Sequence, residues 1–372
     1  MLDNVFGIRL VLLLGSTVPL PASADVMNAL ADVEVTNDSG AGDGFQLKFL
    51  CGRSSLGDYD LIQNGTFAPM TRVIIGVVFG VVPEVLIDGV ITHSQFSPGT
   101  IPGQAMLTVT GKDLTAAMDL EDKNASYENQ ADFIIVTSVL ANYAQYGLIP
   151  SPTPTSDFPI MTDRIPQQQE TDLKFIQRLA TRNGFVFYLE PVTFGVNTAY
   201  WGPQNRLGIP QPALTVDQGS ATNVKSLNFA NDALAPVGTR GVFVEPFTKM
   251  SIPIPSLPSL KIPPLVSSPA TAYRTNLQRD TANQNAATAA TRLLATTTNA
   301  PDAATAEGEA DGVRYGTAMR ARKLVGLRGA GMTHDGFWQV KRVTHTIARG
   351  QYSQKFSLSR EGTGTLTPVV RP

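Results

Sequence analysis

The chain has 372 residues, of which 42% are hydrophobic and 16% are charged, and its formal net charge is −2. This length predicts two or three domains of roughly 100–200 residues each. The near-zero charge and the absence of a dense Lys/Arg run exclude the electrostatic footprint of a nucleic-acid-binding protein. The single cysteine, Cys51, excludes an internal disulfide and a metal site built from several cysteines, and its apolar context predicts a buried thiol.

The first predicted element lies in residues 7–26, which have the outline of a secretory signal because an apolar run precedes Ala22-Ser23-Ala24. The uninterrupted apolar run, Leu10–Leu14, is shorter than the roughly 7–15 residues of a signal, and Asp3 offsets the charge of Arg9. The run has the length of a β-strand. We therefore expect this segment to be retained as the first strand of the fold, and the protein to assemble in the bacterial cytoplasm.

Further strands are predicted up to about residue 111. Apolar and polar residues alternate in residues 30–38 and 44–51, which is typical of half-buried strands. More strands are expected at 72–79, 84–92 and 104–111. The apolar run at 73–82 contains two glycines and is too short for a membrane span, so it predicts a strand pair or a bulged strand. Evenly spaced short strands of this kind indicate a barrel or a sandwich.

In the central part of the chain, helical periodicity replaces strand alternation, which predicts an α+β module. Residues 132–148 place apolar side chains on one helical face, with Gly147 as the helix end. Residues 170–190 predict a second helix that begins near Asp172, ends at Gly184 and leads directly into a strand.

The last third returns to strands, at 214–229 and 237–245. The proline-rich residues 251–270 predict an extended connector, and residues 271–310 predict either a solvated helix broken near Pro301 or a partly ordered insertion. The final 55 or so residues predict a long hairpin that turns at Arg349-Gly350.

Candidate catalytic groups are few. His334 and Asp335 are adjacent, so in an extended segment their side chains point apart and do not form a base with its orienting carboxylate. His345 and His93 lie in predicted strands, where a hydrogen-bonded structural histidine is expected rather than a ligand.

One carboxylate cluster also invites an acid/base interpretation, but a solvated helix start is the favoured explanation; its members are Asp119, Glu121 and Asp122. No nucleophile elbow, zinc-protease motif or phosphate-binding loop is present in the sequence. The sequence therefore predicts no enzyme, and no catalytic, cofactor-binding or metal-binding residue.

Four stretches carry a recognisable pattern: 107–122, 167–190, 227–246 and 320–370. Their distinctive residues are Gly111, Asp113, Asp172, Gly184, Asp335, Gly336, His345, Gly350, Tyr352 and Arg360. Together, and in this order, the stretches resemble the central hub protein of contractile phage tails and extracellular injection systems. That family is related to the late control gene D proteins and to the hub half of VgrG.

The resemblance implies a mainly β fold with an α+β part. We expect a tail-tube-like β-barrel domain at 1–118, an α+β module at 119–213 and a second tube-like barrel at 214–372. The second barrel would hold an insertion at about 247–312. The resemblance implies a structural homotrimer that joins a sixfold inner tube to a threefold spike within a phage tail-like particle, together with other baseplate proteins. Because the chain ends after the closing hairpin, the spike is expected to be a separate protein. No cofactor is implied.

Two alternatives remain open at this point. The signal-like start would suit a secreted β-rich binding protein. A peptidoglycan hydrolase that uses His334 or the carboxylate cluster is the other alternative.

Overall fold

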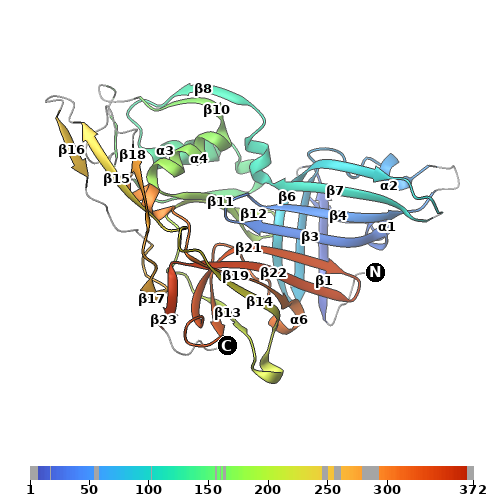
Figure 1. Cartoon of the computed structure of the whole chain (residues 1–372). Helices are drawn as coiled ribbons and strands as arrows, with labels where there is room; N and C mark the ends of the chain where they lie inside the picture. The colour runs from blue at the N-terminus through green and yellow to red at the C-terminus, as the bar shows by residue number, and fades with distance from the viewer. Residues whose placement is uncertain are drawn as a thin grey trace.

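The computed structural model describes residues 7–366, apart from 17, 54–57, 102, 156, 160, 162–164, 245–249, 255–260 and 279–292. The fold is mainly β, as predicted, with a few helices. Its largest element is a sheet of 13 strands that runs through both ends of the chain. Figure 1 shows this sheet in blue and red, with the helices α3 and α4 held to one side of it.

The N-terminal part of the sheet contains seven strands. They are β1 (Ile8–Gly15), β2 (Leu20–Pro21), β3 (Leu30–Asp38), β4 (Gly44–Cys51), β5 (Arg72–Phe79), β6 (Val82–Ser97) and β7 (Ala105–Asp113). The spatial order is β2-β1-β5-β6-β7-β4-β3. β6 is long enough to pair with β5 along its first half and with β7 along its second half. Because β6 pairs with both β5 and β7, these strands surround one apolar core.

The central part follows the turn η1 (Leu114–Met118). Its elements are β8 (Asp122–Ser126), α3 (Asp132–Ala141), η2 (Ala144–Tyr146), β9 (Leu148–Pro152), β10 (Gln167–Thr171), α4 (Asp172–Asn183), β11 (Val186–Thr193) and β12 (Val196–Gly202). The sheet β11-β12-β9 and the two helices enclose a core of their own. α4 begins where the Thr171 hydroxyl accepts a hydrogen bond from the Lys174 amide, and it ends at Gly184, whose φ is +70°.

The C-terminal part adds the remaining strands. They are β13 (Gln211–Thr215), β14 (Val224–Asn231), β15 (Val237–Val244), β16 (Ser251–Ile254), β17 (Val266–Pro269), β18 (Arg274–Gln278), β19 (Ala304–Asp311), β20 (Leu324–Arg328), β21 (Gly336–Ala348), β22 (Gln351–Arg360) and β23 (Gly362–Thr365). The hairpin β21–β22 turns at Arg349-Gly350, as predicted. β14, β19, β22 and β21 continue the main sheet.

The described residues form four apolar clusters, and the three largest correspond to these three parts. The first gathers residues from β1, β3–β7 and Cys51, the second surrounds Trp201 and the helices α3 and α4, and the third surrounds Trp338 and Phe356. The predicted burial of the Cys51 thiol is confirmed, and burial raises its pKa. In the described part of the chain no helix is both long and apolar enough to cross a bilayer.

Residues 8–15 form the predicted strand, which pairs along its whole length with β5. Residues 73–82 form nearly all of β5, a tight turn and the first residue of β6, so the strand-pair interpretation is confirmed. Three short helices among the described residues were not predicted: α1 (Ala24–Ala29), which Ser23 caps, α2 (Asp60–Gln63) and α6 (Gly312–Tyr315). The helix predicted at 132–148 is shorter, because α3 ends at Ala141 and the 3-10 turn η2 precedes Gly147.

One expectation for the C-terminal part was wrong. Within 271–310, residues 304–311 form the strand β19 in the main sheet rather than a solvated helix or an insertion. Residues 293–298 are helical and stop before Pro301, and part of the region lies outside the described residues. Within the proline-rich residues 251–270, the described parts contain the strand β16, which pairs with β15, and the strand β17, which pairs with β23, while residues 255–260 of the predicted connector lie outside the described residues.

Candidate functional site: the strand junction and the groove beside it

The two ends of the chain meet where β21 pairs with β3. The antiparallel register runs from Arg342 opposite Asp38 to Ala348 opposite Asp32. The hydroxyls of Thr36 and Thr344 lie 3.0 Å apart across this pair. Hydrogen bonds and side-chain pairs cross the junction without a break. The strands that carry the first and third apolar clusters therefore belong to one continuous sheet.

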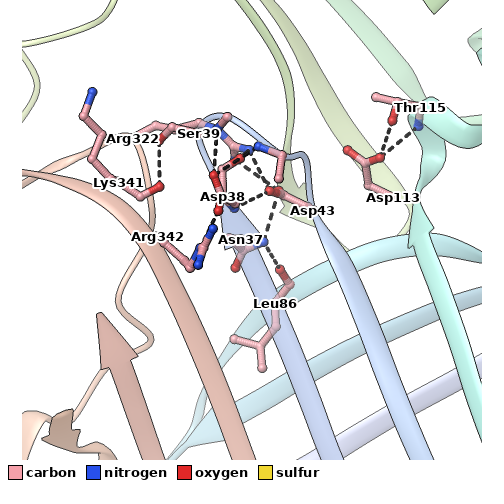
Figure 2. Close-up of polar contacts among 12 residues, drawn as sticks. Asn37, Asp38, Ser39, Asp43, Leu86, Asp113, Thr115, Arg322, Lys341 and Arg342 are labelled. Carbon is pink, nitrogen blue, oxygen red and sulfur yellow. Dashed lines mark hydrogen bonds and ion pairs between the residues drawn. The ribbon is translucent and has the colours of Figure 1, made fainter. Parts of the chain in front are cut away.

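The tight turn between β3 and β4, residues 39–43, is organised by the carboxylates at its two ends. Asp38 Oδ1 accepts hydrogen bonds from the amides of Gly40, at 2.7 Å, and Ala41, at 3.1 Å. Asp43 Oδ1 accepts from the Asp38 amide at 2.9 Å, and Asp43 Oδ2 accepts from the side-chain amide of Asn37 at 3.1 Å. Figure 2 shows these carboxylates pointing toward one another within the turn.

Two arginines from the C-terminal part hold this turn. Arg322 donates to both oxygens of Asp43, at 3.0 and 2.6 Å, and to the Asp38 carbonyl at 2.6 Å. Its guanidinium also lies 4.6 Å from the centre of the Tyr188 ring. Arg342 pairs with the Asp38 carboxylate (Figure 2). Bidentate pairs of this kind fix orientation as well as distance, so the turn, β11 and the segment before β20 are locked together.

The pKa values in this cluster follow from burial and from these contacts. Burial raises the pKa of Asp38, but hydrogen bonds from the Gly40 and Ala41 amides and from Arg342 outweigh burial, so the net pKa is lowered. Burial lowers the pKa of Arg322, but the adjacent Asp43 carboxylate more than compensates and the net pKa is raised. Both groups are therefore charged at neutral pH.

Asp113 lies at the end of β7, beside the same turn, and is 6% exposed. Its amide donates to the Asp43 carbonyl at 3.1 Å. Its Oδ1 caps η1 by accepting a hydrogen bond from the Thr115 amide at 3.3 Å, and it also accepts one from the Thr115 hydroxyl. Burial, and then the charge of Asp43, raise the pKa of Asp113 to about 7, against the opposing effects of Thr115 and Arg322. Asp113 is thus the carboxylate in this cluster with the strongly perturbed pKa.

A groove of about 670 Å³ opens at this point. The outward faces of β3, β4 and β7 form its floor, and the β3–β4 turn and the segment from η1 to α4 form its walls. Four carboxylates and one lysine line it: Glu34, Asp43, Asp113, Asp119 and Lys112.

A further ion pair ties the central part to the N-terminal part. Arg72 donates to Asp88 at 2.8 and 2.6 Å, and both side chains are buried. Arg72 also donates to the Tyr146 carbonyl at 2.8 Å, and Asn197 donates to Asp88 at 2.8 Å. The contacts therefore connect β5 and β6 with η2 and β12.

The structure places Asp172 and Gly184 at the two ends of α4. Asp172 is 1% exposed and accepts hydrogen bonds from Lys123 at 2.6 Å, Tyr143 at 2.8 Å and Gln168 at 2.7 Å. Because these donors come from β8, from the end of α3 and from β10, this carboxylate holds the α+β part together.

The motif residues of the closing hairpin are also structural. His345 is fully buried, with its Nδ1 atom 2.9 Å from the Tyr352 hydroxyl, and burial lowers its pKa to about 3. Arg360 is fully buried too, donates to the Asp335 carbonyl at 3.0 Å and lies 4.1 Å from the centre of the Trp338 ring.

The glycines of the motif occupy positions that a side chain cannot. Gly336 and Gly350 have φ values of +108° and +78° at the two ends of β21. In β7, a Cβ added to Gly111 would lie 2.2 Å from Phe45 Cζ and 2.4 Å from the Val90 carbonyl oxygen. Of the ten motif residues, only Gly111 and Asp113 line the groove.

The candidate catalytic residues are not brought together. The His334 ring stacks on Phe229 at 4.1 Å, while Asp335 accepts a hydrogen bond from the Ala330 amide. His93 is exposed on β6, so the expectation of a hydrogen-bonded barrel residue was wrong for it, whereas it was right for His345.

Of the three clustered carboxylates, Asp119 accepts from the Thr171 hydroxyl at 2.6 Å, and Glu121 and Asp122 are exposed. This arrangement is a solvated segment after η1. It does not resemble a pair of carboxylates held for acid/base work.

No family model matches the chain, and no curated protein matches it. Solved structures do. The tail protein of Neisseria meningitidis MC58 superposes with a TM-score of 0.62 at 13% identity, covering 96% of this chain and 98% of that one. The 43 kDa tail protein of prophage MuSo2 from Shewanella oneidensis gives 0.63 at 14%, covering 95% and 99%. The chain has the fold of phage tail proteins.

The tail-protein fold also occurs in a secretion apparatus. An Escherichia coli component of the type VI secretion system, described as similar to the bacteriophage T4 tail proteins gp27 and gp5, gives a TM-score of 0.55 at 14% identity. This comparison covers 92% of this chain and 77% of that one. The likeness inferred from the four sequence stretches is therefore confirmed at the level of the fold.

Proposed function

We propose that this protein is a structural, non-enzymatic baseplate hub of a contractile phage tail or injection system. It acts as a homotrimeric adaptor between a sixfold inner tube and a threefold spike, alongside other baseplate proteins. The observation that carries the proposal is the tail-protein fold over nearly the whole chain. Residues 1–118 and 214–372 serve as two tube-like units, with the module 119–213 between them. Three copies then present six such units to the tube.

The free edges of the main sheet support a ring of copies. β14 pairs only with β19, and the second half of β6, residues 92–97, pairs only with β7, among the strands described. Most side chains along these two stretches are exposed. An unpaired strand edge is a template for another strand. We propose that the β14 edge of one copy pairs with the β6 edge of the next, and that the ring closes after three copies.

Cross-linking tests this arrangement, because the chain has a single, buried cysteine. Gln95 and Asn228 are exposed on the two free edges. The double variant Gln95→Cys/Asn228→Cys, treated with a short bismaleimide, is expected to give covalent dimers and trimers, while each single variant stays monomeric on a denaturing gel. Cross-linking that stops at dimers would contradict the closed ring.

We also propose that the protein assembles in the bacterial cytoplasm with its N-terminal segment retained. The support is that β1 contributes Ile8, Leu10 and Leu12 to the first apolar cluster, and that burying such side chains stabilises by about 1.5–3 kcal/mol each. Mass spectrometry of the native protein is expected to find the peptide Met1–Arg9. Its absence would favour the secreted binding protein.

The non-enzymatic part of the proposal has its own test. The side chain of His334 stacks on Phe229 and its pKa is lowered, first by burial and then by Arg360. Wild type and His334→Ala are expected to be equally inactive on peptidoglycan. Hydrolysis by the wild type that the substitution abolishes would establish the rival, a hydrolase.

A further inference from the structure

The carboxylates around the β3–β4 turn outnumber the arginines that hold them. Arg342 pairs with Asp38, and Arg322 uses both of its terminal nitrogens on Asp43. Asp113 accepts hydrogen bonds only from Thr115 in the part of the chain described, and its second oxygen, Oδ2, has no donor there. A carboxylate so nearly buried is costly unless a cation or a proton compensates its charge.

The groove gives a ligand access to this oxygen. Its lining is acidic, because three carboxylates besides the Arg322-paired Asp43 line it together with a single lysine, Lys112. Its rim is apolar: Leu120 is 67% exposed and Met70 is 37% exposed, and both line the same groove. The combination suits the side chain of a basic residue, whose methylene stem contacts apolar atoms while its head meets a carboxylate.

A bound metal ion would meet the charge requirement in another way. The described residues, however, contain no group of three or more His, Cys, Asp or Glu side chains that could hold a metal ion. Hard cations such as Ca²⁺ take six to eight oxygen ligands. The groove therefore fits an organic cation better than a metal.

We propose that this groove binds a loop of a partner protein that carries an arginine, and that the guanidinium pairs with Asp113. The inference rests on the proposed function in one respect, since it takes the partner to be another component of the same particle. It adds the chemistry of that contact: a basic loop, docking at the place where the polar sheet face meets the α+β part. A guanidinium fits because it stays charged, is only weakly hydrated, and can donate a charge-assisted hydrogen bond to the one oxygen, Oδ2, that Thr115 leaves free.

The test uses two peptide probes on the full chain, Ac-Gly-Ala-Arg-Ala-Gly-NH₂ and the same peptide with citrulline, the neutral isostere of arginine. We expect the arginine peptide to bind wild type about 10- to 100-fold more tightly than the citrulline peptide, as for one charge-assisted contact. Asp113→Asn, which keeps an oxygen for Thr115, is expected to reduce arginine binding to the citrulline level. Glu121→Gln, an exposed substitution outside the groove, is the matched control and should bind like wild type.

A second readout locates the contact. In protein labelled with ¹³C at aspartate carboxyls, the resonance that Asp113→Asn removes is expected to move on addition of the arginine peptide and not of the citrulline peptide. Equal affinity for the two peptides, no binding up to about 1 mM, or unchanged binding by Asp113→Asn would overturn the inference. Light scattering on the same samples reports the oligomeric state separately, so a failure of the trimer and a failure of this contact are distinguishable.

Discussion

Replacing Asp113 with asparagine should change how the stability of the protein depends on pH. The substitution keeps the shape of the side chain and the oxygen that caps η1, because asparagine is as good an N-cap as aspartate. It removes only the ability to ionise. The pKa of Asp113 is raised from 3.8 to about 7, mainly by burial and next by Asp43.

The sign and size of the effect follow from proton linkage. Between pH 3.8 and about 7 the folded protein keeps a proton on Asp113 that the unfolded chain has lost, so stability falls as pH rises. One pKa unit corresponds to about 1.4 kcal/mol, and the two pKa values give a loss of about 2–3 kcal/mol between pH 5 and pH 8. Asp113→Asn has no such loss. It should therefore gain about 2–3 kcal/mol over wild type between these pH values.

Urea denaturation at pH 5 and pH 8 measures this difference, with Glu121→Gln as the control for a carboxylate in water. The control should follow wild type at both pH values. If Asp113→Asn and wild type lose stability in parallel from pH 5 to pH 8, the Asp113 carboxylate is already ionised and compensated in the folded protein. The reasoning about an uncompensated carboxylate in the groove would then be wrong.

Three further substitutions test the junction and the packing of β7, each by urea denaturation at pH 7. Arg322→Met should lower the free energy of unfolding by about 3–5 kcal/mol, because it leaves the Asp43 carboxylate buried without its cation. A loss under about 1 kcal/mol would contradict the conclusion that Arg322 holds the β3–β4 turn in place. Arg342→Met should cost at most about 1 kcal/mol, since that side chain is 58% exposed. Gly111→Ala should cost about 1–3 kcal/mol through overlap with the Phe45 ring, and an unchanged midpoint would show that β7 can shift.

Local signals predicted much of the fold. Alternation in residues 30–38 and 44–51 fixes which side chains are buried, and Gly184 marks the end of a helix that also starts where predicted. Such signals fail for a buried strand whose own side chains are small, because a large side chain of a neighbouring strand then fills the space in the core. β19, residues 304–311, consists largely of small and acidic residues, and Gly308 faces the Phe356 ring, which fills the space that its missing side chain leaves. The sequence therefore resembled a solvated segment.

The junction could not be predicted, because its partners are distant in the sequence. β3 and β21 are about 300 residues apart, and neither strand carries a mark that identifies the other. Asp38 and Asp43 bracket a glycine-containing turn, which is a visible signal for a tight connection. Nothing near Arg322 indicates that its guanidinium reaches across to that turn. Motif residues such as Asp113 were found by resemblance, but the role of Asp113 in the groove emerges only from its neighbours in space.

The oligomeric state in solution tests the central claim most directly. Multi-angle light scattering of the purified chain, alone and with the spike protein of the same particle that we propose as its partner, should give three 39.8 kDa copies of this chain, either at once or when the spike is added. A stable dimer in both samples would contradict the account, because a twofold contact uses the same surface on both copies and cannot form a threefold ring from the β6 and β14 edges.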